Sequence, residues 1–184
     1  MKTISRKDAI SIYSALGAIS LGHFAEETLD SVINNLNACR KVNDEMQKLN
    51  EELTKRLYAD VDEQKKNECF ELLGKLDAIR AKAYKTTDEA KAALAEVKDI
   101  TSKLEGEYAD IMEIYAKHNK VYSNLLAKEV EVEIEELDAD IFTKGVLKGS
   151  KDVAVHEIRA TFAAMLKAEE QKDADFSELD ELLK

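Results

Sequence analysis

Metal binding is the first chemistry to test in this sequence, because carboxylates are abundant and three histidines accompany them: His23, His118 and His156. A di-iron or di-manganese bundle takes Glu-x-x-His from two helices and a Glu from each of two others. The residues three positions before the histidines are Ser20, Tyr115 and Val153, so that spacing is absent. His23, Glu26 and Glu27 could hold one metal ion at a helix start, but a surface histidine beside first-turn acids explains them more simply. We therefore predict no metal site and no cofactor.

Motifs of nucleophilic and phosphate chemistry are also missing. The chain has no G-x-S-x-G, no phosphate-binding loop and no dinucleotide glycine pattern; Gly145 and Gly149 lack both the spacing and the helix context. The acids of Glu129–Glu135 alternate with apolar residues and lack the turn of a calcium-binding loop. Isolated cysteines such as Cys39 and Cys69 are typical of reduced, buried thiols in an intracellular protein. The sequence predicts a protein that is not an enzyme.

A polar-aromatic stripe runs at helical spacing in the second half of the chain: Tyr108, Tyr115, His118 and Tyr122. Tyrosine joins apolar area to a hydroxyl, so the stripe could contact a partner helix. Ordinary packing near the end of a helical bundle explains the same spacing and is the favoured interpretation. The three tyrosines remain candidate interface residues.

The charge of the chain disfavours nucleic acid as a direct partner. Its 38 acidic and 27 basic residues give a formal net charge of −11, which repels phosphate. The densest basic clusters, Lys2-Arg6-Lys7 and Lys65-Lys66, are short and carry no interleaved aromatic residues. Such acidity would also suit an inhibitor that mimics nucleic acid and binds a basic protein.

The N-terminus has the outline of a signal peptide, because basic residues precede an apolar stretch, Ala9–Leu21. Asp8 interrupts the transition, and the apolar residues of the stretch fall at helical spacing among serines. We interpret it as an amphipathic helix and the protein as cytoplasmic. No stretch approaches the ~20 apolar residues that a membrane span needs.

Long helices dominate the predicted fold, because proline is absent and apolar residues recur at steps of three and four. Ser5 can cap the first helix, Gly22 can stop it in the left-handed conformation, and Thr86 with Glu89 forms a capping box. The longest helix would run unbroken from Thr86 to Lys128, roughly 60 Å. The predicted helices are Arg6–Ser20, Ala25–Tyr58, one ending near Tyr84, Thr86–Lys128 and Asp152–Glu170.

Only Glu129–Glu135 has the alternation of a half-buried β-strand. A single strand needs a partner for its edges. One candidate is the segment Ile141–Leu147, which Gly145 interrupts. The other is the same strand in a second copy of the chain. Pairing across a dimer would make Val130, Val132 and Ile134 interface residues.

Two parts of the chain carry a resemblance. The opening, Ile4–Ile10, and the helix that bears Ile12–Leu16 precede a long polar helical middle, and the late strand Glu129–Ile134 leads into a helical end. This layout resembles a group of small, mostly helical bacteriophage and prophage proteins of unknown function. The resemblance implies a location in the host cytoplasm, a role in phage assembly or regulation, and no catalytic residues.

Taken together, these patterns predict a mainly α fold of long antiparallel helices, a bundle or an extended hairpin, with a small β element near the C-terminus. We expect a bundle in residues 1–128, a strand and short helix in 129–172, and an acidic tail in 173–184. The predicted function is that of a non-enzymatic oligomerising or adaptor protein, prophage-encoded, and a homodimer. The alternatives are an acidic inhibitor of a basic protein and a small metal-binding helical enzyme.

Overall fold

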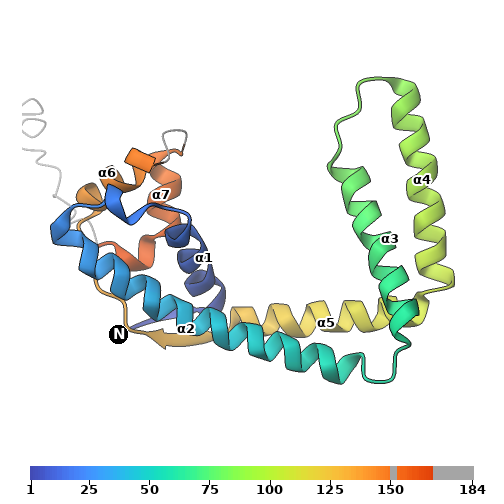
Figure 1. Cartoon of the computed structure of the whole chain (residues 1–184), viewed down its shortest axis with the longest axis horizontal. Coiled ribbons are helices and arrows are strands. Elements are labelled where there is room, and N and C mark those ends of the chain that lie inside the picture. Colours follow the sequence, from blue (N-terminus) through green and yellow to red (C-terminus); the bar gives the residue numbers. More distant parts are fainter. Residues whose placement is uncertain (150–152, 168–184) are drawn as a thin grey trace, which may run out of the picture. The chain divides into compact units, whose positions relative to one another are not determined.

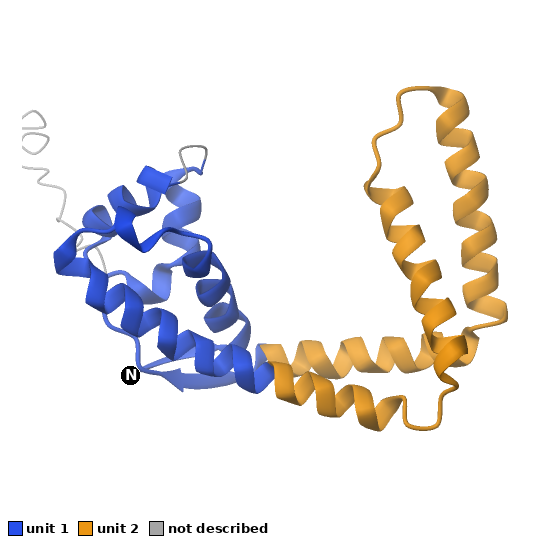
Figure 2. Cartoon of the chain, viewed as in Figure 1, with its two compact units in different colours: residues 1–46, 127–184 blue, residues 47–126 orange. Residues whose placement is uncertain are grey.

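The computed structural model describes residues 1–149 and 153–167. These residues form seven α-helices, two 3-10 turns and two β-strands, so the predicted mainly α fold is confirmed. The chain divides into two compact units: unit 1, Met1–Met46 with Ala127–Lys184, and unit 2, Gln47–Leu126 (Figure 2). These ranges differ from the predicted division after residue 128. The predicted tail, 173–184, lies outside the described residues.

Unit 1 contains an antiparallel sheet of two strands, β1 (Lys2–Ser5) and β2 (Glu129–Val132). Lys2 lies opposite Val132, and Ser5 lies opposite Glu129. The predicted strand is therefore confirmed over four residues, and its partner within the chain is β1 rather than residues 141–147. Pairing of the strand with a second copy of the chain stays a prediction. Residues 141–147 belong instead to helix α6 (Ala139–Gly149), where Asp138 Oδ1 accepts hydrogen bonds from the N–H groups of Asp140 and Ile141, both at 3.0 Å. That cap favours helix over strand.

Helix α1 (Arg6–Gly17) begins as predicted, because Ser5 Oγ accepts a hydrogen bond from the Asp8 N–H at 3.0 Å. It ends before the predicted Ser20. The expected left-handed stop at Gly22 was wrong, since no glycine of the described residues has a positive φ. The chain instead tightens into a 3-10 turn, η1 (Leu21–His23), in which the His23 N–H donates to the Ser20 carbonyl at 3.0 Å.

Helix α7 (Val155–Thr161) and the turn η2 (Ala163–Met165) replace the predicted longer helix, whose outer residues lie partly outside the described ranges. After η2 the chain is extended and pairs with Leu137 through backbone hydrogen bonds. The Leu137 N–H donates to the Met165 carbonyl, and the Leu137 carbonyl accepts from the Lys167 N–H. The core of unit 1 packs α1, α6, α7 and β2 on α2 and includes Ile12, Leu16, Val32, Cys39, Phe142 and Ile158.

Helix α2 (Glu26–Leu57) confirms the predicted second helix (Figure 1). Val32, Cys39 and Met46 are seven residues apart and are all buried, so they lie along one face of the helix. The helix contributes residues to both units. Among the described helices, none is long and apolar enough to cross a bilayer.

Unit 2 contains a helical hairpin, in which α3 (Glu63–Ala81) and α4 (Thr87–Gly106) lie side by side and antiparallel (Figure 1). Asp62 caps α3 by accepting a hydrogen bond from the Lys65 N–H at 2.8 Å. Thr86 caps α4 as predicted, accepting from the Glu89 N–H at 3.2 Å. The reciprocal bond of the capping box goes to a different group, because Glu89 accepts from the Lys85 N–H.

The predicted unbroken helix from Thr86 to Lys128 was wrong. Helix α4 ends at Gly106, and α5 (Ala109–Ala127) begins three residues later. Glycine is a poor helix former, and the N–H groups of Glu107 and Tyr108 both donate to the Lys103 carbonyl, which closes α4. The Tyr108 side chain is buried at this break and its hydroxyl donates to Glu68 Oε2 at 3.1 Å. The helical spacing of apolar residues continues through this break. Tertiary packing, which that spacing does not reveal, therefore ends the helix here and changes the direction of the chain.

Candidate interaction surface

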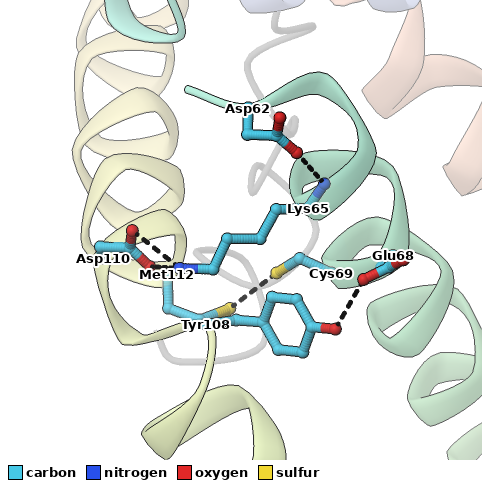
Figure 3. Close-up of polar contacts among 7 residues, drawn as sticks. All are labelled: Asp62, Lys65, Glu68, Cys69, Tyr108, Asp110 and Met112. Carbon is cyan, nitrogen blue, oxygen red and sulfur yellow. Dashed lines mark hydrogen bonds and ion pairs between the residues drawn. The ribbon is translucent and has the colours of Figure 1, made fainter. Parts of the chain in front are cut away.

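Polar contacts fix the start of α3 against the start of α5 (Figure 3). Lys65 Nζ donates to both carboxylate oxygens of Asp110, at 3.0 and 3.1 Å. The Cys69 thiol points to Met112 Sδ at 3.9 Å, beside the bond between Tyr108 and Glu68. Because these contacts bridge two helices, they set where α5 crosses the base of the hairpin.

The core of unit 2 is small for its length. Residues 47–126 bury seven apolar side chains in one cluster: Tyr58, Cys69, Leu76, Ile100, Leu104, Tyr108 and Ile111. Other apolar side chains of the hairpin, among them Leu72, Leu73, Ile79 and Val97, are only partly buried. A two-helix hairpin has no second layer to cover them, so unit 2 leaves apolar area in contact with water.

One side of the hairpin carries a hollow of about 520 Å³, which we call the groove. Its apolar floor comes from three helices and consists of Leu73, Leu76, Leu104, Ala109, Met112 and Tyr115. Its polar rim consists of Asp77, Arg80, Thr101 and Glu105. A second, smaller hollow of the hairpin is lined by Leu72 and Tyr108 and by five charged residues, Glu68, Glu71, Lys75, Lys103 and Glu107. The groove is therefore the more apolar of the two hollows.

Leu94 extends the apolar side of the hairpin beyond the groove. It lies seven residues before Thr101 and eleven before Glu105, so all three fall on one side of α4. Its side chain is 68% exposed, more than any other large apolar residue of the described ranges except Met1. Because Leu94 and the groove lie on one side of the hairpin, that side is the candidate interaction surface.

Charge is distributed unevenly between the hairpin and the rest of the chain. Residues 63–106 carry nine basic and nine acidic side chains, so this segment is neutral. The remaining 18 basic and 29 acidic residues account for the whole net charge of −11. The hairpin is thus one of the parts of this acidic protein that another acidic surface can approach without net repulsion.

The predicted tyrosine stripe is divided among three environments. Tyr108 is buried in the core of unit 2, whereas Tyr115 lines the groove and contacts Phe70 edge to face at 6.1 Å between ring centroids. Tyr122 stacks on His118 at 6.2 Å, and the His118 ring approaches Thr54 Oγ1 at 3.3 Å. Of the three candidate tyrosines, Tyr115 is the one that the groove includes.

The candidate strand residues lie against the core of unit 1. Val132 and Ile134 are 3% and 7% exposed, and Val130 packs partly buried beside them. Their apolar side chains are already covered by this chain, so the case for a protein contact moves to the hairpin. Glu129, Glu131 and Glu133, the alternating acids, are exposed.

The potential metal and thiol residues stay apart from the groove. Within the described ranges no group of three His, Cys, Asp or Glu side chains could hold a metal ion, and His23 and Glu26 do not form such a group. Cys39 and Cys69 are free thiols, both buried. Burial raises the pKa of Cys39 to about 11, which suppresses its thiolate.

Comparison with known proteins identifies no relative: no protein-family model, no curated protein and no solved structure matches the chain. The resemblance to small phage and prophage proteins therefore stays a prediction. The class that the fold defines is a mainly α protein with an amphipathic helical hairpin.

The Lys65–Asp110 contact predicts a measurable titration. The hydrogen bond from Lys65 is the main cause that lowers the pKa of the Asp110 carboxyl. The contact therefore stabilises the fold above the unfolded-state pKa of about 3.9, and this is lost as pH falls through the lower folded value. In Lys65→Met we expect a higher Asp110 pKa, measured by NMR titration of its carboxyl carbon. Identical titrations in the two proteins would contradict the prediction.

Proposed function

We propose that this protein is non-enzymatic and works by self-association, with the groove side of the hairpin as its contact surface. The observation that carries the proposal is the small core of unit 2 beneath an apolar groove. A second hairpin laid on the groove would supply the missing layer and complete a four-helix bundle. The function of such a protein is to form an oligomer. Association of the hairpins would bring two copies of unit 1 into one complex.

Charge supports a second copy as the occupant of the groove. Two copies of a chain with net charge −11 repel one another where their acidic segments meet. The neutral segment 63–106 avoids that repulsion, and it is also the segment with incompletely covered apolar side chains. A basic partner protein could bind an acidic surface and would need no neutral one. The neutral segment therefore favours a second copy of this chain as the partner.

Leu94→Glu tests the proposal by sedimentation equilibrium over a range of protein and salt concentrations. Burial of a leucine contributes about 1.5–3 kcal/mol, and a symmetric dimer buries it twice. We expect the dissociation constant of the dimer to rise by about a hundredfold or more. Because Leu94 is largely exposed in the single chain, the substitution should leave the fold of the monomer intact.

Ala95→Glu is the matched control. It adds the same charge to the same helix at the next residue, which is exposed and lies about 100° further round α4, away from the groove side. This variant should associate like the wild type. A wild-type chain that stays monomeric at every concentration, or equal effects of the two substitutions, would contradict the proposal.

A further inference from the structure

The charged residues of the groove rim are placed at its two ends. Arg80 lies in the last turn of α3, and Glu105 lies at the C-terminal end of α4. Because α3 and α4 are antiparallel, the C-terminal end of α3 points toward the tip of the hairpin, whereas that of α4 lies at its base (Figure 1). Neither side chain has an ion-pair or hydrogen-bond partner among the described residues, and both are exposed. The rim therefore presents the Arg80 guanidinium toward one end of the groove, with the Asp77 carboxylate one turn before it on α3, and the Glu105 carboxylate at the other end.

We infer that two copies recognise each other by pairing their hairpins antiparallel, with Arg80 of each copy against Glu105 of the second copy. The inference rests on the proposed function and names the arrangement of the same contact. A two-fold axis across the middle of the groove places each end of one groove against the opposite end of the second copy's groove. The contact between Arg80 and Glu105 therefore forms twice. Paired charges of opposite sign fix the register and direction of helices more than they add affinity.

The apolar residues of the hairpin also fit antiparallel pairing. Leu94 lies in the first half of α4, on the side toward the tip, whereas Ala109, Met112 and Tyr115 form the apolar floor at the base, where α5 crosses. Antiparallel pairing brings the exposed Leu94 of one copy to the open apolar floor of the other. Parallel pairing would instead set Leu94 against Leu94 and bring together the two Arg80 side chains at one end and the two Glu105 side chains at the other.

The face is large enough for a specific dimer. Helices of about twenty residues are roughly 30 Å long, and two of them side by side are roughly 20 Å wide. Two such faces cover about 1,200 Å² in total, which is the lower limit of standard protein interfaces. The groove, Leu94 and the two symmetric charge pairs all lie within that area, which needs no contribution from unit 1.

Charge reversal tests the arrangement. Arg80→Glu places like charges together twice in its own dimer, and Glu105→Arg does the same with positive charge. We expect each variant alone to dissociate at least tenfold more readily than the wild type in sedimentation equilibrium. An equal mixture of the two variants should form mixed dimers of near wild-type affinity, because both contacts then join opposite charges. The doubly substituted Arg80→Glu/Glu105→Arg chain should also recover self-association.

The outcomes separate this inference from the proposed function. If the mixture associates no better than its components while Leu94→Glu still dissociates the wild-type dimer, the antiparallel pairing is wrong and the groove remains the contact surface. If the wild type is monomeric, the proposed function fails and the pairing with it. Native mass spectrometry of the mixture, with one variant isotopically labelled, identifies the mixed dimer directly. Recovery in the double variant excludes misfolding as the cause of the single-variant losses.

Discussion

Replacing Asn35 with alanine is expected to lower the free energy of unfolding of unit 1 by about 3 kcal/mol. Asn35 is fully buried in α2, and its carboxamide makes two bonds with the backbone of the segment that follows β2. Its Nδ2 donates to the Glu135 carbonyl at 2.9 Å, and its Oδ1 accepts from the Glu135 N–H at 2.7 Å. Alanine leaves both backbone groups without partners, each costing about 1–3 kcal/mol.

Asn34→Ala is the control for this prediction. Asn34 is the neighbouring residue and also bonds Glu135, but it donates to the side-chain Oε1 at an exposed position. Since water can replace that bond, we expect a loss within about 0.5 kcal/mol. The two cysteines report on the two units separately, because Cys39 is buried in unit 1 and Cys69 in unit 2.

Pulsed alkylation in increasing urea measures the effect. Asn35→Ala should lower the urea concentration at which Cys39 becomes reactive, whereas Cys69 should change much less. Equal shifts for Asn35→Ala and Asn34→Ala would show that the buried carboxamide does not hold this segment.

The contact between Asn35 and Glu135 illustrates how far the sequence could predict unit 1. The period-two alternation of residues 129–135 correctly predicts a strand, because one buried face imposes that pattern. Its partner strand, Lys2–Ser5, was missed because four residues are too few to show the alternation of a strand. The same residues can equally be interpreted as the segment that precedes the helix cap at Ser5. An asparagine in a polar helix gives no local sign that its carboxamide will meet a backbone a hundred residues away.

The sequence analysis named one residue of the groove, Tyr115, as a candidate interface residue, although it favoured ordinary packing for the tyrosine stripe. The groove itself was not predicted. The stripe was assigned to one straight rod because apolar residues continue at the same period through Gly106 and Tyr108. The break changes the direction of the apolar residues that follow it, so that Met112 and Tyr115 join Leu73 and Leu76. Which residues share a groove depends on the register of three helices, and no single-helix period contains that information.

Gly145→Val is expected to destabilise unit 1 by about 3 kcal/mol, although the residue lies inside a helix, where glycine is normally unfavourable. A Cβ atom at Gly145 would lie 2.6 Å from Phe24 Cδ1 and 3.1 Å from Phe24 Cε1. The Phe24 ring is buried and stacks on Phe142 at 5.5 Å, and Phe142 contacts Phe162 at 5.0 Å. The ring has no free space to enter, so α6 must move away from η1 and open the aromatic core. The same glycine that interrupts a strand pattern in the sequence is therefore required by close packing in a helix.

Gly74→Val provides the matched comparison. Gly74 also lies inside a helix, α3, but a Cβ there would meet nothing within 4 Å. Valine has a somewhat higher helix propensity than glycine, so we expect a change within about 0.5 kcal/mol, in the stabilising direction. Urea-dependent alkylation of Cys39 should reveal the loss in Gly145→Val, and that of Cys69 should show near wild-type behaviour in Gly74→Val. Gly145→Ala, which adds only the Cβ atom, should fall between the wild type and Gly145→Val. If all three variants unfold like the wild type, α6 does not approach Phe24 as closely as these distances require.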